Sequence, residues 1–325
     1  MDSPQYVFGA QAFGVAWTNE NVDQLMQALN DYGIHHFDTA ALYPATAPGG
    51  SEKLLGEKKQ PGAVIDTKVM FMLSNMLSKE NMEKSIRDSL ERLQISEIHT
   101  LFTHAPDRQT PIAEQAANFD HFYRAGLFQQ LGLSNYTPEM VREWLDIATE
   151  KNYVKPSVFE GQYNIFCRGY EEDLFPLLRE HNMTFAATSP LAGGFLTGKL
   201  TFSTSPADLA GTRFEAAEGN MLGAVYRMWY DQPVFHEAMR TLKDLAHLHH
   251  TTPEKFAMRW LLFHSPLRSA DTIVIGPNNF SQLNSYLEAR QAGALPADVA
   301  LAIDNLFGPL KEVAAPMIEA GWWSL

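Results

Sequence analysis

Four residues of this chain could together donate a proton to a carbonyl oxygen. Asp38 and Tyr43 lie in the segment HHFDTAALYP (35–44), and Lys68 and His104 each end a later apolar run. A tyrosine is a weak acid with a pKa near 10, and a neighbouring ammonium group lowers that pKa. A carboxylate would hold the ammonium in place, and a histidine could orient the carbonyl oxygen or relay a proton. The alternative for Asp38 is that it only caps the following helix.

Protonation of a carbonyl oxygen also requires a nucleophile that attacks the carbonyl carbon. The sequence offers no activated serine or cysteine, and its single cysteine, Cys167, is interpreted as a buried apolar residue. A cofactor would therefore supply the nucleophile, and hydride is the natural candidate.

Short β-rich runs alternate with amphipathic helical segments along the chain, about eight times. The runs are 6–9, 34–38, 63–68, 97–104, 128–134, 157–162, 184–189 and 271–276. The clearest helical segments are 21–33, 81–94, 111–126 and 137–151. Because the runs are apolar throughout, they are typical of parallel strands covered on both faces. We predict an α/β fold, a (β/α)₈ (TIM) barrel forming a single domain over residues 1–325, with a doubly wound sheet as the alternative.

Polar residues end six of these runs. They are Asp38, Lys68, His104, Ser134, Gln162 and Ser189. In a (β/α)₈ barrel the carboxyl ends of the strands meet at one face, where active sites form. We therefore expect these side chains to converge.

The interval between the seventh and eighth strands is longer than the others. It begins with a Gly-, Ser- and Thr-rich stretch, which predicts a long binding loop or lid over 190–230, and continues with two helices at 234–250 and 253–265. The HLHH group at 247–250 ends the first of these helices and is interpreted as a helix terminus rather than as a metal site.

Composition excludes several classes of protein. The 325 residues carry a formal net charge of −13, which argues against a nucleic-acid partner. The sequence contains no apolar run long enough to cross a membrane and no secretory signal pattern at its start. With one cysteine, the chain is expected to be a cytoplasmic protein.

Several motifs resemble the signature of the aldo-keto reductase superfamily. They include FDTAALY, EKLLG (52–56), DTK (66–68), LFTHAPD (101–107), GLSNY (132–136), EGQYN (160–164) and SPLAGGFLTGK (189–199). The last block, with GTRF (211–214) and VYR (225–227), is similar to the aflatoxin-aldehyde reductase (succinic semialdehyde reductase) branch. The resemblance implies a barrel that reduces aldehydes or ketones with NADPH and without a metal. It makes Tyr43 the general acid, Lys68 and Asp38 its tuning pair, and His104 the orienting group.

The resemblance also implies a cofactor site. Ser134, Asn135 and Gln162 would hold the nicotinamide carboxamide. The pyrophosphate would lie against the loop after the seventh strand, and the adenosine end against the loop after the eighth. The residues assigned to these loops are Ser189, Leu191, Gly193, Leu196, Gly198, Lys199, Arg213, Gly276, Asn278 and Gln282. The segment 276–286 lacks the arginine or lysine that often reads the 2′-phosphate, so NADPH is expected with NADH as the alternative.

Aromatic residues predict the kind of substrate. Trp17, Tyr226, Arg227 and Trp229 are assigned to the substrate pocket, and Trp229 stands where this branch often has a second arginine. We therefore expect a small carbonyl substrate that is bulky or aromatic rather than strongly anionic. A homodimer is compatible with the resemblance, with the C-terminal GWWSL near the site or at a dimer contact.

Two other functions use the same residues. The chain could be a cofactor-binding regulatory subunit of the same fold, which acts mainly through partners. It could also be a redox-neutral enzyme, such as a dehydratase, that uses Tyr43 and Lys68 for proton transfer alone.

Overall fold

The eight predicted strands form one closed parallel barrel in the computed structural model, in the order β1 to β8. The structure describes residues 3–71, 75–216 and 219–319; the GWWSL segment lies outside these ranges. The strands are β1 (Gln5–Gly9), β2 (His36–Asp38), β3 (Val64–Lys68), β4 (Ile98–Phe102), β5 (Phe128–Ser134), β6 (Pro156–Gln162), β7 (Thr184–Thr188) and β8 (Thr272–Ile275). The prediction of a (β/α)₈ barrel is confirmed.

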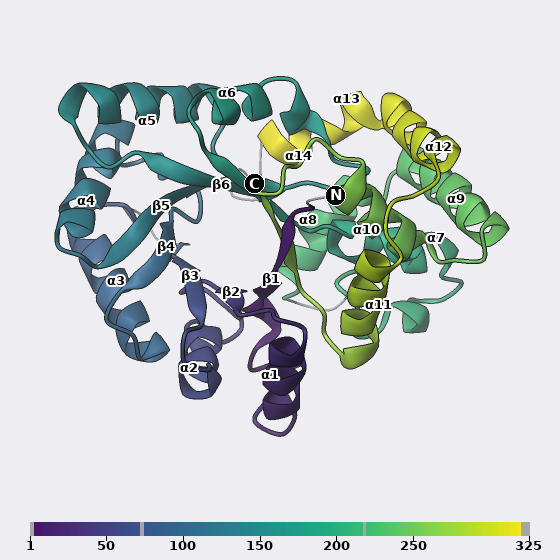
Figure 1. Ribbon diagram of the computed structural model, residues 1–325, viewed down its shortest axis with the longest axis horizontal. Helices are drawn as coiled ribbons and strands as arrows, with labels where there is room; N and C mark the ends of the chain where they lie inside the picture. The colour runs from purple at the N-terminus through teal and green to yellow at the C-terminus, as the bar shows by residue number, and fades with distance from the viewer. Residues whose placement is uncertain (1–2, 72–74, 217–218, 320–325) are drawn as a thin grey trace.

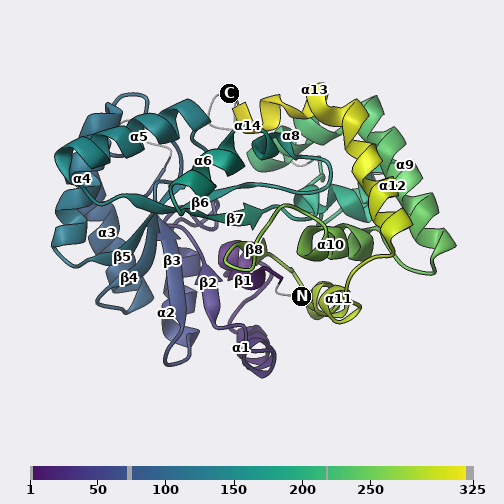
Figure 2. The ribbon, with the colours of Figure 1, turned by 45° about the horizontal axis from the view of Figure 1, so that its top comes forward.

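Helices surround the barrel, and most of them connect consecutive strands (Figures 1 and 2). Those between β1 and β7 are α1 (Val22–Asp31), α2 (Gly50–Lys58), α3 (Lys79–Leu93), α4 (Ile112–Arg124), α5 (Pro138–Lys151) and α6 (Leu174–Glu180). Apolar residues on their inner faces are buried against the strands, for example Leu25, Ile86 and Trp144. After β8 come α11 (Phe280–Gln291), α12 (Ala297–Phe307), α13 (Lys311–Ala314) and α14 (Pro316–Glu319).

The barrel closes between its first and last strands. β1 pairs with β8 in parallel register from Gln5 opposite Thr272 to Phe8 opposite Ile275. On the other side β8 pairs with β7, with Ala186 opposite Thr272. Closure makes the carboxyl ends of all eight strands face the same end of the barrel.

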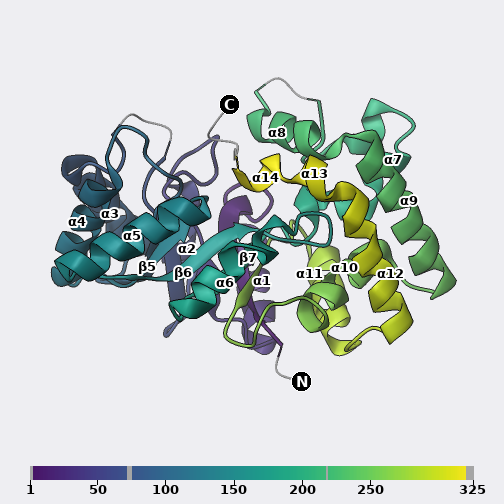
Figure 3. The ribbon, with the colours of Figure 1, turned by 90° about the horizontal axis from the view of Figure 1, so that it is seen from above.

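The interval between β7 and β8 is helical over much of its length, which differs from the predicted long loop. It contains the 3₁₀ segment η3 (Ala192–Thr197), α7 (Lys199–Phe202), α8 (Met221–Tyr230), α9 (Pro233–Leu248) and α10 (Pro253–Phe263). The two predicted helices correspond to α9 and α10. Helix α8 was not predicted; the Asn220 side chain caps its first turn by accepting from the Gly223 N–H group. Figures 2 and 3 show α8 next to α14.

No helix among the described residues is both long and apolar enough to cross a membrane.

Candidate active site

Lys68, the last residue of β3, is fully buried and is held by groups from two other strand ends. Its Nζ atom donates to Asp38 Oδ1 at the end of β2 and, at 3.1 Å, to the Thr39 carbonyl oxygen. Glu160 Oε2 on β6 lies 3.2 Å from the same nitrogen. Burial lowers the pKa of Lys68, but the charges of Asp38 and Glu160 outweigh that effect and raise it above its ordinary value. The lysine is therefore an ammonium group.

Tyr43 follows β2 in the same cluster, as predicted. Its hydroxyl oxygen is 3.5 Å from His104 Nε2, and the two rings meet edge to face with centroids 5.4 Å apart. The Lys68 nitrogen lies 5.9 Å from the Tyr43 ring centroid. The structure thus brings together all four residues predicted to form the proton-donating group.

Lys68 lowers the pKa of Tyr43, as expected, but the net shift is upward. Burial raises the pKa of Tyr43 above its ordinary value, and the positive charge of Lys68 opposes that shift without reversing it. The tyrosine consequently keeps its proton over the physiological range. Lys68 makes Tyr43 a stronger acid than the buried site alone would allow.

His104 lies just beyond β4 and is buried. Burial, reinforced by the nearby charge of Lys68, lowers the pKa of its imidazole to about 3. The ring is therefore neutral at physiological pH. A neutral imidazole can orient a carbonyl oxygen by a hydrogen bond without carrying charge into the site.

Glu160 belongs to this cluster and was not predicted from the sequence. Burial raises the pKa of its carboxyl group, the charge of Asp38 adds to the effect, and Lys68 only partly opposes it, so the pKa is about 8. The signal was present in EGQYN: residues i and i+2 of a strand share a face, so Glu160 must point the same way as Gln162.

Three predicted carboxamide-binding residues lie at the ends of β5 and β6. Ser134 is buried, and its hydroxyl group accepts a hydrogen bond from Asn135 Nδ2 at 3.1 Å. Asn135 has a left-handed backbone (φ 66°), and its side chain also donates to the His104 carbonyl oxygen at 2.9 Å. Gln162 donates to Cys167 Sγ at 3.7 Å, while its buried Oε1 has no hydrogen-bond partner in the structure. That oxygen can accept from a ligand N–H group.

The loop after β7 has an unusual backbone. Ser189, Ala192, Gly193, Gly194 and Gly198 all have positive φ. At Gly193 a Cβ atom would lie 2.3 Å from the ring of Tyr226, so only glycine fits there. The predicted glycines thus allow close packing of this loop against α8.

Ser189, Gly193, Arg213 and Tyr226 are brought together around this loop. The hydroxyl groups of Ser189 and Tyr226 are hydrogen-bonded at 2.5 Å. The Arg213 guanidinium stacks 4.8 Å from the Tyr226 ring centroid and donates to Gln11 Oε1 at 3.0 Å. Trp229 is buried, with its ring 5.4 Å from that of Tyr226.

The remaining residues assigned to the pyrophosphate differ in exposure. Leu191 is half-buried and Lys199 is exposed, whereas the Leu196 side chain is fully buried in the core. Only backbone atoms of Leu196 could therefore reach a ligand without repacking. Lys199 begins α7 and has an ammonium group available to solvent.

The loop after β8 is exposed at Gly276 and Asn278, and Gln282 in the first turn of α11 is exposed too. Its polar groups are partly used within the loop, because Gln282 Oε1 accepts from the Asn278 N–H group at 2.7 Å. The Asn279 side chain in turn accepts from the Gln282 N–H group at 2.9 Å and caps α11.

Two residues assigned to the substrate are occupied by contacts within the protein. Trp17 is fully buried, donates to the Pro277 carbonyl oxygen at 2.7 Å, and packs edge to face on Phe280. Arg227 donates to the Phe214 carbonyl oxygen and, at 3.2 Å, to Asp231. These contacts assign Trp17 to packing between two loops.

Cys167 is buried and free, as predicted, and burial raises the pKa of its thiol to about 12. It is therefore a poor nucleophile at physiological pH.

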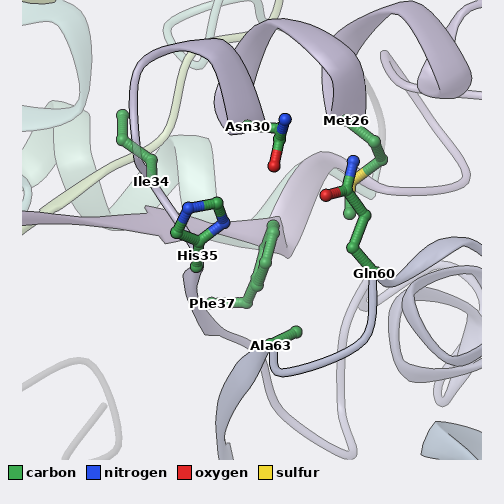
Figure 4. A pocket seen from close by; sticks show the side chains of 7 residues that line it. All are labelled: Met26, Asn30, Ile34, His35, Phe37, Gln60 and Ala63. Atoms are coloured by element: carbon green, nitrogen blue, oxygen red, sulfur yellow. The ribbon is translucent and has the colours of Figure 1, made fainter.

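The residues at the barrel mouth fit a nicotinamide cofactor on their own chemistry. The unpartnered Gln162 oxygen and the hydroxyl group of Ser134 suit a carboxamide, and the glycine-rich loop after β7 allows close approach of a phosphate. The described segment 276–286, a short loop followed by the start of α11, has no cationic side chain for an added 2′-phosphate. A small hollow elsewhere on the surface lies between α1 and the starts of β2 and β3, lined by Met26, His35, Gln60 and four other residues (Figure 4).

Comparison with known proteins agrees with this geometry. A model described as the aldo/keto reductase family matches residues 6–307. The chain is 30% identical over 300 residues to an aldo-keto reductase of Pseudocercospora fijiensis, which covers 90% of this chain and 99% of that protein. Two Homo sapiens proteins each match 93% of this chain and 93% of their own length. They are aldo-keto reductase family 7 member A3, at 29% identity over 314 residues, and aflatoxin B1 aldehyde reductase member 4, at 28% over 314 residues.

Proposed function

Because this chain belongs to the aldo/keto reductase family, in its aflatoxin-aldehyde reductase branch, we propose that it reduces an aldehyde or ketone to the alcohol with NADPH and with Tyr43 as the general acid. The family makes the chain an oxidoreductase that acts on small carbonyl compounds with a nicotinamide cofactor. The observation that carries the proposal is the group formed by half-buried Tyr43 and buried Lys68, Asp38 and His104 at the carboxyl ends of the strands.

Each residue of this group has a separate role in the proposal. Bound reduced nicotinamide supplies hydride to the carbonyl carbon. The carbonyl oxygen accepts a hydrogen bond from neutral His104 and takes the proton of the Tyr43 hydroxyl group. As that proton leaves, the Lys68 ammonium stabilises the tyrosinate, and Asp38 holds the ammonium in position.

The cofactor contacts are part of the proposal. Ser134, Asn135 and Gln162 would hold the carboxamide, and the loop from Ser189 to Lys199 would hold the phosphates, with Arg213 beside it. NADPH is favoured by the family resemblance. Because the loop after β8 lacks a cation, we expect a smaller preference over NADH than an arginine fork would give, which the ratio of kcat/KM for the two cofactors measures.

Substitution of Tyr43 by phenylalanine tests the proposal most directly. Loss of general acid catalysis should lower kcat by roughly 10²- to 10⁴-fold, while the affinity for NADPH stays nearly unchanged because Tyr43 acts on the substrate. NADPH absorbance with a panel of aldehydes measures turnover, and fluorescence titration measures binding. If the native protein binds NADPH without turnover, the regulatory-subunit alternative replaces the enzyme. If Tyr43→Phe retains full activity, the assignment of the acid is wrong.

The aromatic residues of α8 support a preference among carbonyl substrates. Tyr226 and Trp229 pack beside the loop after β7, and the Arg227 guanidinium is engaged by Asp231 and a backbone oxygen. We expect higher kcat/KM for aromatic aldehydes than for succinic semialdehyde. A clear preference for succinic semialdehyde would contradict this expectation and would make Arg227 the candidate carboxylate ligand.

A further inference from the structure

Two histidines and an aspartate meet on three neighbouring strands, just to the amino-terminal side of the catalytic group. His36 is the first residue of β2, Asp66 lies in the middle of β3, and His99 is the second residue of β4. His36 Nε2 is 2.6 Å from Asp66 Oδ2, and His99 Nδ1 is 2.8 Å from Asp66 Oδ1. Asp66 thus presents one oxygen to each imidazole, and the two imidazole rings are nearly perpendicular, with centroids 5.4 Å apart.

The donor atoms of this cluster suit a divalent transition metal. Imidazole nitrogen and carboxylate oxygen are ligands of Zn²⁺ and of related first-row ions, and three protein ligands leave room for water. The three donor atoms lie within 4.8 Å of one another. Ligands at about 2.1 Å from a shared ion can be at most about 4.2 Å apart, so an ion needs only a small inward movement of the side chains.

We propose that His36, Asp66 and His99 form a site for one divalent transition-metal ion of the zinc type. The ion would replace the two hydrogen bonds to Asp66 and link β2, β3 and β4 near their amino ends. The site shares no residue with the catalytic group, although Asp66 is the strand partner of Asp38, and it supplies no step of the proposed reaction.

The solvent exposure of the two histidines and the position of a neighbouring glutamine favour such a site. The side chains of His36 and His99 are each 29% exposed, whereas Asp66 is 10% exposed, so an ion can enter from solvent and meet a mostly buried carboxylate. Gln130 on β5 lies beside the far nitrogen of His99, with 3.4 Å between Gln130 Nε2 and His99 Nε2. When His99 binds an ion through Nδ1, its Nε2 carries the proton, and the Gln130 amide can present its oxygen to that proton.

Zinc titration of the full-length protein, freed of metal with EDTA, tests the proposal. We expect one Zn²⁺ per chain by calorimetry, a higher Tm with Zn²⁺ than with EDTA, and a visible absorption band when Co²⁺ replaces Zn²⁺. His36→Gln and His99→Gln should each weaken Zn²⁺ binding by at least about 10-fold, since even outer partners of a metal ligand contribute that much. The double variant should lose both the band and the rise in Tm.

The control is His249→Gln, in the HLHH group at the end of α9, which should leave binding unchanged. Both strand histidines are partly exposed, so their glutamine variants are expected to fold, and circular dichroism checks this. Two results would overturn the proposal: no binding by the native protein with Zn²⁺ in large excess, or binding that survives in the double variant and disappears in His249→Gln.

Discussion

Glu160 gives the Lys68 ammonium a second carboxyl neighbour, and its protonation state sets the net charge around Tyr43. Below a pH of about 8 the Glu160 carboxyl group is neutral and adds no charge beside the Lys68 ammonium. Above that pH Glu160 is ionised, and its charge raises the pKa of Tyr43 further. A tyrosine with a higher pKa is a weaker general acid.

The rate of carbonyl reduction should therefore fall as pH rises through about 8, with the slope of a single ionisation. Glu160→Gln keeps the shape of the side chain and cannot ionise, so its kcat should stay level to higher pH. Profiles of kcat against pH for the native enzyme and the variant measure the difference. Glu172→Gln, at an exposed glutamate paired with Lys311, is the matched control and should behave like the native enzyme. If the profiles of Glu160→Gln and the native enzyme are identical, another group causes the fall in kcat.

At the scale of elements, α2 and α3 touch through their backbones. A Cβ atom at Gly56 would lie 2.2 Å from the Arg92 carbonyl oxygen, so the glycine makes the close approach possible. Four residues earlier on α2, buried Glu52 accepts from Thr67 on β3 at 2.6 Å and from Arg92 at 2.7 Å. The EKLLG motif thus holds α2 against α3 and against β3, the strand that carries Lys68.

Gly56→Ala should lower the free energy of unfolding by about 1–3 kcal/mol, because the added methyl group overpacks a rigid backbone contact. Gly308→Ala is the control: a Cβ atom at Gly308 meets nothing within 4 Å and its φ is negative. The control should be neutral or slightly stabilising. Urea denaturation measures both variants, and equal stabilities would show that α2 and α3 can separate without cost.

Helix α8 shows why part of this interval could not be predicted. The Gly- and Ser-rich stretch before it is typical of a loop, and its aromatic residues alone do not distinguish a helix from a binding loop. Its buried face, formed by Tyr226, Trp229 and Tyr230, follows helical spacing, which is the signal that could have identified it. The contact between Tyr226 and Ser189 depends on tertiary packing and leaves no pattern in the sequence.

At the scale of the whole molecule, Asp271 helps to close the barrel. This fully buried residue directly precedes β8 and accepts from both terminal nitrogens of Arg179 on α6, at 2.8 and 2.5 Å. It also accepts from the Phe185 N–H group on β7 at 2.8 Å. One carboxylate therefore connects the seventh and eighth strands and the helix between the sixth and seventh.

Asp271→Ala should lower the free energy of unfolding by about 3–5 kcal/mol, because it leaves a largely buried guanidinium without its partner. Asp23→Ala removes an ion pair with Lys58 in which the Asp23 side chain is 71% exposed, and should cost about 0–1 kcal/mol. Thermal or urea denaturation of both variants tests the contrast. If Asp271→Ala lowers the free energy of unfolding as little as Asp23→Ala does, Asp271 does not help to close the barrel.

Much of the architecture was predictable, because parallel strands that are buried on both faces appear in the sequence as short apolar runs. The polar residues that end them, such as Lys68 and His104, could be recognised for the same reason. Glu160 could have been recognised from its place two residues before Gln162 on the same strand face. The cluster around Asp66 could not, because it depends on which residues of neighbouring strands lie opposite one another. His36 Nε2 lies 2.6 Å from Asp66 Oδ2, a contact between two strands that no pattern in the sequence indicates.

The pairing of β1 with β8 also has a consequence for synthesis of the chain on the ribosome. Residues 5–9 emerge first, but their partner at 272–275 emerges last among the strands, so β1 has an open hydrogen-bonding edge during most of translation. Open edges are the usual starting points of aggregation. A nascent chain released before Thr272 would keep two such edges, on β1 and β7, and we expect it to need chaperones that the complete barrel does not.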